Sequence, residues 1–223
     1  MTNFELKTPC IRPDQVAKWI SEPRFRSYLQ ARGGEHERAL ALYNWNAAMS
    51  AAFLEVIYHL EVLMRNSIDR QFSPTEPAEP LSILIPNVWL CDPKTLTDEG
   101  RERVNEAINR LQREGRTPTR ARLVSSLTFG FWQALFSGAY EDLWRARLAL
   151  AFPNGNGRRR QVANLAGPIL HFRNRVAHHE SIFSSDLTGQ HRRILRLAGL
   201  IDSEAKSYIA DLSRVEQLLI EKP

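Results

Sequence analysis

From His36 to Phe72 the sequence contains neither glycine nor proline. Because these residues are the usual interruptions of a helix, the stretch favours one helix of about 55 Å at 1.5 Å per residue. So long a helix is unusual in a small domain. The alternative is a break between Asn44 and Ser50, which would give two packed pieces. Its second half carries an apolar stripe at helical spacing, consisting of Phe53, Ile57, Leu60, Met64 and Ile68.

The rest of the chain also follows helical patterns separated by turn residues, so the predicted fold class is all-α. Further helices are predicted over residues 13–20, 25–31, 97–114, 117–127, 140–152, 158–180, 186–197 and 203–220. Gly167 and Pro168 should kink or split the helix that contains them. Residues 73–86 hold four prolines and predict an extended loop. We therefore expect a single all-α domain over residues 1–223, with a loop-rich insertion near 73–96.

Composition and charge limit the class of protein but do not identify a function. A net charge of +5 and a pI near 9.5 permit an anionic partner such as RNA but do not require one. Cys10 and Cys91 stand far apart, which suggests a reducing compartment and no disulfide framework. Neither a signal peptide nor a zinc-ligand spacing is evident, so we expect a cytoplasmic protein with no membrane span and no metal or other cofactor.

The most unusual polar pattern lies between Gly167 and Glu180, where Arg173 and Asn174 are followed by the paired His178 and His179. A guanidinium can hold phosphate oxygens, and an imidazole can move a proton near neutral pH. On an ideal helix His178 lies about 40° from Asn174, whereas Arg173 lies about 140° away. Because it shares a strip of the helix with Asn174, His178 is favoured over His179 as the functional histidine. The alternative is a histidine that merely suits a helix C-terminus.

Other polar groups are weaker candidates. Glu61, Arg65 and Asn66 form a second set, for which a surface pair at spacing i,i+4 is the simple alternative. The clusters Arg158, Arg159, Arg160 and His191, Arg192, Arg193, Arg196 are usually solvated faces, yet with Arg175 they are the best candidates for an RNA backbone track. The aromatic residues between Phe129 and Phe136, and also His171, are expected to pack in the core.

The segment from Arg173 to Glu180 resembles the R-x4-6-H motif of the HEPN superfamily of helical ribonucleases, and more narrowly the Abi-like proteins of bacterial abortive infection. Residues 60–69 and 127–132 resemble two further segments of these proteins. The resemblance implies a HEPN-like helical bundle, a homodimer and metal-independent RNA cleavage to a 2′,3′-cyclic phosphate in a defence or toxin system. It implies catalytic roles for Arg173, Asn174 and His178, with His179, Glu61, Arg65 and Asn66 in support.

The resemblance leaves partners and activity open. An antitoxin or regulatory partner is expected for a toxin-like protein. Some relatives carry a modified tyrosine two residues after the motif histidine, but Glu180 stands there in this chain, which argues against that route of regulation. The main alternative is a non-catalytic helical module that binds RNA or a protein.

Overall fold

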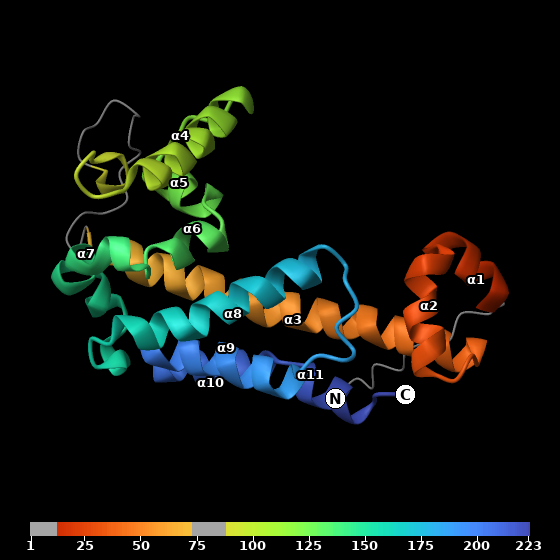
Figure 1. The fold of residues 1–223 in the computed structure, drawn as a ribbon. Coiled ribbons are helices and arrows are strands. Elements are labelled where there is room, and N and C mark those ends of the chain that lie inside the picture. The colour runs from red at the N-terminus through yellow and green to blue at the C-terminus, as the bar shows by residue number, and fades with distance from the viewer. Residues whose placement is uncertain (1–12, 73–87) are drawn as a thin grey trace.

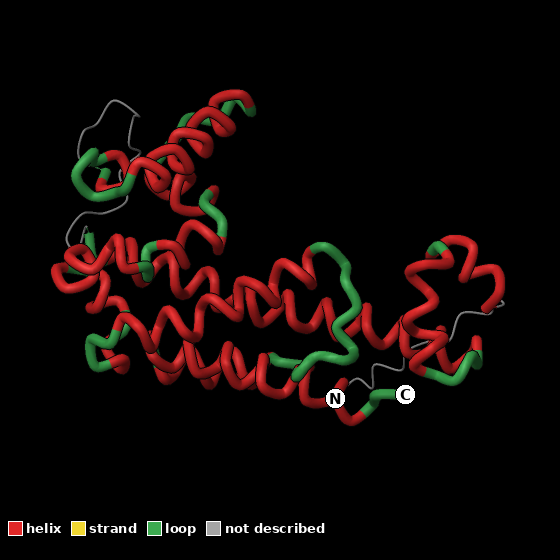
Figure 2. The backbone as a smooth tube through the Cα atoms, in the orientation of Figure 1, coloured by secondary structure: helices red, strands yellow, loops and turns green. Residues whose placement is uncertain are grey.

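The computed structural model describes residues 13–72 and 88–223, and within these ranges it contains helices and no strand (Figures 1 and 2). The all-α prediction is confirmed. Helix α3 (His36–Arg70) has 35 residues and runs along most of the molecule. Residues 44–50 lie inside it, so the alternative of two separate pieces is not realised.

Tertiary packing explains why α3 is continuous. Helices α8 (Arg159–Ala177), α9 (Leu187–Ile201), α10 (Ser203–Leu212) and α11 (Val215–Ile220) all pack against it. Trp45 and Met49, within the segment where a break was considered, are buried, and the Trp45 indole N–H donates to the carbonyl of Leu218 at 2.6 Å. These contacts supply the stability that a helix of this length lacks in isolation.

Helix α8 is also continuous, although Pro168 lies inside it. Proline removes the hydrogen bond to the carbonyl of Asn164, four residues earlier. Asn164 and Pro168 are both exposed, so water can reach that carbonyl. The predicted split at Gly167 and Pro168 was therefore wrong, and the helix ends at Ala177, not at Glu180.

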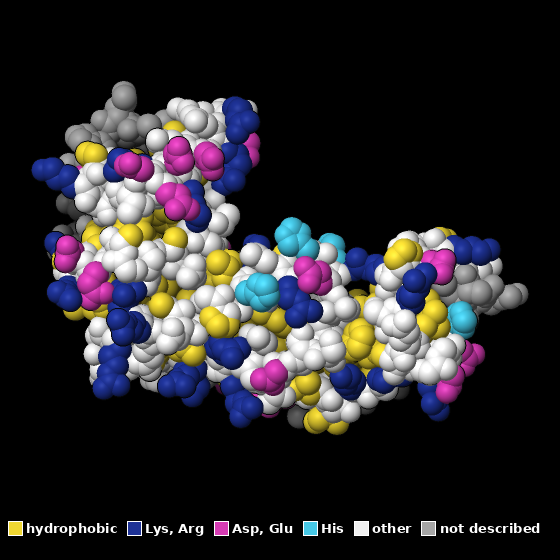
Figure 3. Space-filling model, in the orientation of Figure 1, with side chains coloured by type: hydrophobic (Ala, Val, Ile, Leu, Met, Phe, Trp, Pro, Cys, Tyr) yellow, Lys and Arg dark blue, Asp and Glu magenta, His cyan; other side chains and the backbone are white. Residues whose placement is uncertain are grey.

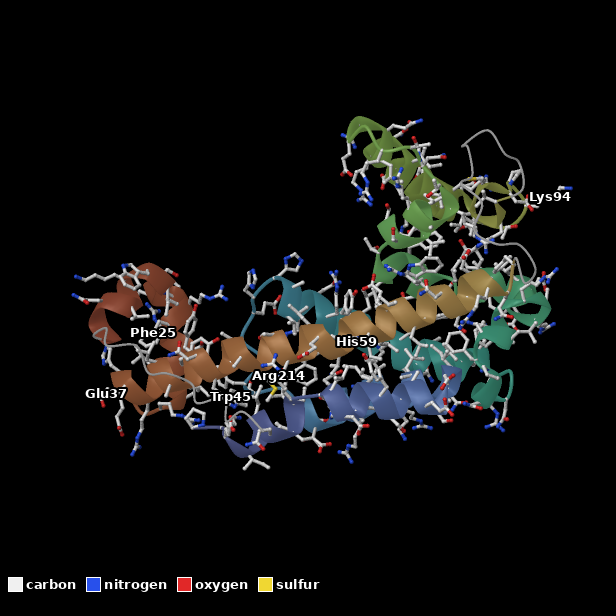
Figure 4. All side chains as sticks on the ribbon, turned by 180° about the vertical axis from the view of Figure 1, so that it is seen from behind. Phe25, Glu37, Trp45, His59, Lys94 and Arg214 are labelled. Atoms are coloured by element: carbon white, nitrogen blue, oxygen red, sulfur yellow. The ribbon has the colours of Figure 1, made fainter. Side chains whose placement is uncertain are left out.

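Two smaller groups of helices lie at opposite ends of α3 (Figure 1). Helices α1 (Pro13–Ile20) and α2 (Glu22–Ala31) pack near its start. Helices α4 (Asp98–Arg113), α5 (Arg120–Ser126) and α6 (Phe129–Ala134) follow beyond its end. In the view from behind, the labelled Phe25 and Lys94 mark these two ends (Figure 4). Most of the proline-rich segment, residues 73–87, lies outside the described residues.

Asp69, near the end of α3, attaches the second group. Its carboxylate accepts hydrogen bonds from the Trp89 indole at 2.9 Å and from Arg120 Nε at 3.0 Å. Trp89 begins a short 3-10 helix (Trp89–Cys91) and is buried. The four aromatic residues predicted for the core, Phe129, Phe131, Trp132 and Phe136, are buried as well, which confirms that prediction.

Several boundaries differ from the sequence prediction. The helix predicted over residues 117–127 is shorter, Arg120–Ser126, and is capped by Thr119, whose side chain accepts from the backbone N–H of Arg122. The helix expected over residues 140–152 is shorter, α7 (Glu141–Ala146), and is followed by a 3-10 turn. The final helix is divided into α10 and α11 around Ser213.

Among the described helices, α3 is the one whose length and composition would allow it to cross a membrane. The core helix of a soluble protein passes the same test, and 39% of the relevant window is buried. Part of the apolar surface of α3 is therefore left uncovered by the residues that the structure describes. The cytoplasmic location stays a prediction.

Candidate functional site

The motif histidines occupy the end of α8. His178 is the C-terminal cap, and His179 follows in the left-handed conformation with φ = 57°. The N–H of His179 donates to the carbonyl of Val176 at 3.0 Å, and the N–H of Glu180 donates to that of Arg175 at 2.9 Å. This is the Schellman arrangement, in which glycine usually takes the left-handed position. It fixes the backbone at both histidines while their side chains remain exposed.

Arg175 holds the segment that follows. Its guanidinium contacts Glu180 at 3.1 Å, the hydroxyl of Ser185 at 3.0 Å and the carbonyl of Ser181 at 2.7 Å. From α3, the buried side-chain oxygen of Asn46 accepts the N–H of Ile182 at 2.8 Å. Arg175, assigned to RNA binding from the sequence, thus has its donors engaged within the chain.

Arg173 and Asn174 lie one turn before the cap. Arg173 is partly buried, and its Nη1 donates to the side-chain oxygen of Asn174 at 3.4 Å. Asn174 is exposed, and its backbone carbonyl accepts the N–H of His178 at 2.9 Å. Within the described residues, the side chain of Asn174 therefore hydrogen-bonds to Arg173.

Histidine side chains gather over the C-terminal end of α8, on the floor of the hollow between the two groups of helices (Figure 3). His171, His178 and His179 are all exposed. The expectation that His171 packs in the core was wrong, because its position on α8 faces away from α3. The structure thus presents the motif on a surface that a large ligand can reach.

Glu61 of α3 connects the second polar set with the motif. Helices α3 and α8 pack together. The rings of Phe53 and Phe172 meet edge to face, with their centroids 4.7 Å apart. Burial raises the pKa of the Glu61 carboxyl above its ordinary value, and the charges of Arg173 and Arg65 oppose this effect only in part. The charge of Arg173 on α8 thus acts on a carboxyl of α3, although the two residues are far apart in sequence. Asn66, the remaining member of the set, is exposed.

The predicted basic clusters have mixed environments. Arg158 and Arg160 are exposed at the start of α8, whereas Arg159 binds Glu141 at 2.5 Å and the carbonyl of Phe136 at 2.6 Å. The pKa of the Glu141 carboxyl is below its ordinary value, mainly because Arg159 donates a hydrogen bond to it. On α9, Arg192 and Arg196 are exposed.

The two remaining residues of the α9 cluster differ. Arg193 is partly buried and donates to the side chain of Gln190 at 2.9 Å. His191, grouped with solvated residues from the sequence, is 3% exposed, and its Nε2 lies 2.9 Å from the hydroxyl of Ser213. That grouping was wrong for His191, because its ring faces the junction of α10 and α11.

A groove of about 740 Å³ adjoins the motif, and the sequence analysis did not identify it. Its walls come from α1, α2 and α3, and Val176 and His179 form the end toward α8. The exposed Trp19 and Leu54, at 70% and 40% of their surface, line it. The signal in the sequence was an apolar strip on α3 with spacing 4, 3, 4, consisting of Ala47, Ala51, Leu54 and Tyr58, all of them exposed. Within residues 13–72 and 88–223, no group of three or more His, Cys, Asp or Glu side chains is arranged to hold a metal ion.

The fold and site define an α-helical protein that presents an Arg-Asn-x-x-x-His motif at the end of a core helix. The family model of the Abi-like proteins matches residues 17–184, from α1 to the segment after α8. This is most of the chain, and the chain belongs to the Abi-like protein family. Membership indicates a function of the abortive-infection type. Among curated proteins and among solved structures, none matches the chain significantly.

Proposed function

We propose that this protein is a metal-independent endoribonuclease of the HEPN type, acting in an abortive-infection or toxin-like defence system. The observation that carries the proposal is the exposed His178 on a fixed helix end, one turn after the contacting pair Arg173 and Asn174. Permanent cation, amide and titratable imidazole are the groups that phosphodiester cleavage needs.

In the proposed reaction His178 removes the proton of the ribose 2′-hydroxyl, and the resulting oxygen attacks the adjacent phosphorus. The bond from phosphorus to the 5′ oxygen breaks, and that oxygen takes a proton from a second imidazole or from water. Arg173 stabilises the charge that builds on the non-bridging oxygens. Asn174, in contact with Arg173, orients the guanidinium. The products are a 2′,3′-cyclic phosphate and a 5′-hydroxyl end.

The second imidazole is assigned to a second copy of the chain. On a helical wheel Ala47, Ala51, Leu54 and Tyr58 fall within an arc of about 60° on α3. All four are exposed, and Ala47, Ala51 and Leu54 line the groove to which His179 also belongs. A second copy covering this strip would bury apolar surface and bring two α8 ends close together. RNA is the proposed partner, and an antitoxin or other regulator is a further proposed one.

Incubation of the purified protein with RNA in the presence of EDTA tests the activity. We expect cleavage that yields 5′-hydroxyl ends, detectable by direct 5′ labelling without phosphatase treatment. His178→Ala should reduce the rate at least 100-fold. The matched control is His36→Ala, which removes an exposed histidine outside the motif, at the start of α3. Equal rates for the two variants would refute the catalytic role of His178.

The second candidate is a non-catalytic RNA-binding module. It is favoured by exposed arginines that lie outside the motif, namely Arg158, Arg160, Arg192 and Arg196. Such residues contribute salt-dependent affinity for phosphates without any chemistry. RNA binding without cleavage, unaffected by His178→Ala, would identify this function.

A further inference from the structure

Two Asn-Gly pairs follow one another in the turn before α8, at residues 154–157. An asparagine followed by glycine is chemically labile, because the backbone nitrogen of the glycine can attack the side-chain amide carbon of the asparagine. Glycine has no side chain that blocks this approach. The attack also requires that the glycine N–H is free to lose its proton. The hydrogen bonds of the turn therefore decide which of the two asparagines reacts.

The first pair is held by hydrogen bonds at both reacting groups. Gly155 is buried, and its N–H donates to the carbonyl of Phe152 at 2.8 Å. The side-chain amide of Asn154 donates to the carbonyl of Gly199 on α9 at 2.9 Å. Attack on Asn154 would break both bonds, so the fold protects this asparagine.

The second pair lacks both restraints. Within residues 13–72 and 88–223, neither the N–H of Gly157 nor the side chain of Asn156 makes a hydrogen bond. Both residues are exposed, and Gly157 lines a pocket of about 620 Å³ at the surface. Asn156 is also in the left-handed conformation, with φ = 49°, which strains a residue that has a Cβ atom. The fold thus leaves this asparagine accessible to the reaction.

The hydrogen bonds that do reach the second pair engage carbonyl groups. The N–H of Arg158 donates to the carbonyl of Gly155 at 3.1 Å, and the Trp144 indole donates to that of Gly157 at 2.8 Å. Neither bond occupies the nitrogen that attacks. Because glycine rotates freely about φ, the nitrogen of Gly157 can turn toward Asn156 while the Gly157 carbonyl stays bound.

We propose that Asn156 is a site of spontaneous deamidation, whereas Asn154 stays intact. Hydroxide removes the proton from the N–H of Gly157, and the nitrogen attacks Cγ of Asn156. The C–N bond of the side-chain amide breaks, and ammonia leaves. Water then opens the resulting succinimide ring at either carbonyl, which gives aspartate or isoaspartate. The net reaction consumes one water and releases one ammonia.

The reaction adds a negative charge close to the start of α8. Asn156 stands two residues before the N-cap, Arg158, whose side chain is exposed. A carboxylate near a helix N-terminus is stabilised by the partial positive charge of the free backbone N–H groups. The modified protein therefore stays folded, with less positive charge in the cluster of Arg158, Arg159 and Arg160.

Incubation of the folded protein at mildly alkaline pH in water enriched in heavy oxygen, followed by tryptic peptide mapping, tests the proposal. Cleavage after Arg147 and Arg158 places both asparagines in one peptide, where fragment ions distinguish them. We expect Asn156 to convert at least about 10-fold faster than Asn154, because one net hydrogen bond corresponds to about a factor of ten. Equal rates, or faster conversion of Asn154, would overturn the proposal.

The same protein unfolded in urea is the control. Unfolding removes the hydrogen bonds of the turn, so the two Asn-Gly pairs should then react at rates within about twofold of each other. If Asn156 keeps its full advantage in urea, the neighbouring sequence sets the rate. The role assigned to the fold would then be wrong.

Two variants test whether the fold holds one side chain and not the other. Asn156→Asp should change the melting temperature by less than about 1 °C. Asn154→Asp should lower it by about 2–4 °C, because a carboxylate replaces the donor that faces the carbonyl of Gly199. An equal loss in both variants would show that the side chain of Asn156 is also held, contrary to the proposal.

Discussion

The guanidinium of Arg24 on α2 donates a hydrogen bond to the backbone carbonyl of His179, at the end of α8. The first pair of helices is thereby attached to the motif, although Arg24 and His179 are 155 residues apart in the sequence. His179 is also left-handed, and its side chain is exposed. Its backbone is thus held from two sides, while its side chain makes no hydrogen bond or ion pair within the described residues.

Replacing His179 with glycine should stabilise the protein. A non-glycine residue in the left-handed region is strained, and glycine removes that strain at the usual glycine position of this helix end. We expect the free energy of unfolding to rise by about 0.5–1 kcal/mol, measured by urea denaturation. RNA cleavage should persist, because the proposed catalytic imidazole is that of His178. Loss of cleavage in His179→Gly, with stability retained, would assign catalysis to His179 instead.

Replacing Asn46 with alanine should loosen the segment after α8. Its buried side-chain oxygen accepts the N–H of Ile182, and truncation leaves that donor unpaired. The expected loss of stability is about 2 kcal/mol. Hydrogen exchange should show the largest gain around Ile182. Replacement of the neighbouring Ala47, whose side chain is exposed, with serine serves as the control and should change stability by less than about 0.5 kcal/mol.

Acidification should destabilise the protein through His191. Burial lowers its pKa below the ordinary value of 6.5, only partly opposed by Glu216. The unfolded chain therefore binds the proton more readily, and stability falls as the pH drops through 6.5 toward the folded-state pKa. We expect His191→Gln to lose less stability than the wild type between pH 7.5 and 5.5 in urea titrations. Parallel losses in the two proteins would show that His191 is not the cause.

Leu54→Glu should disrupt the proposed dimer. It places a charge in the middle of the exposed strip on α3, where a second copy would bury it unpaired. Light scattering after size exclusion should report a monomer, and RNA cleavage should fall at least 10-fold. Leu212→Glu on α10 is the matched control, because Leu212 is also 40% exposed but lies outside the groove. A wild-type monomer would exclude the dimer from the start.

Local signals allowed much of the helical framework to be predicted. The helix predicted from residue 203 begins there, because the Asp202 carboxylate accepts the N–H groups of Glu204 and Ala205. The helix predicted over residues 97–114 is α4, and Gly115 follows it with φ = 68°. Capping and chain reversal depend on a few adjacent residues, so the sequence is sufficient for them. The end of α8 was misplaced because His179 occupies a position where glycine is the usual signal.

The amino-acid order alone determined the all-α class, the candidate triad of Arg173, Asn174 and His178, and the apolar faces that drive packing. These follow from spacing within a few helical turns. Only the tertiary structure decided that α3 is continuous, that His191 is buried, and that the charge of Arg173 acts on the pKa of Glu61. Burial and proximity depend on which distant segments pack together, and the pattern of neighbouring residues in the sequence does not determine that packing.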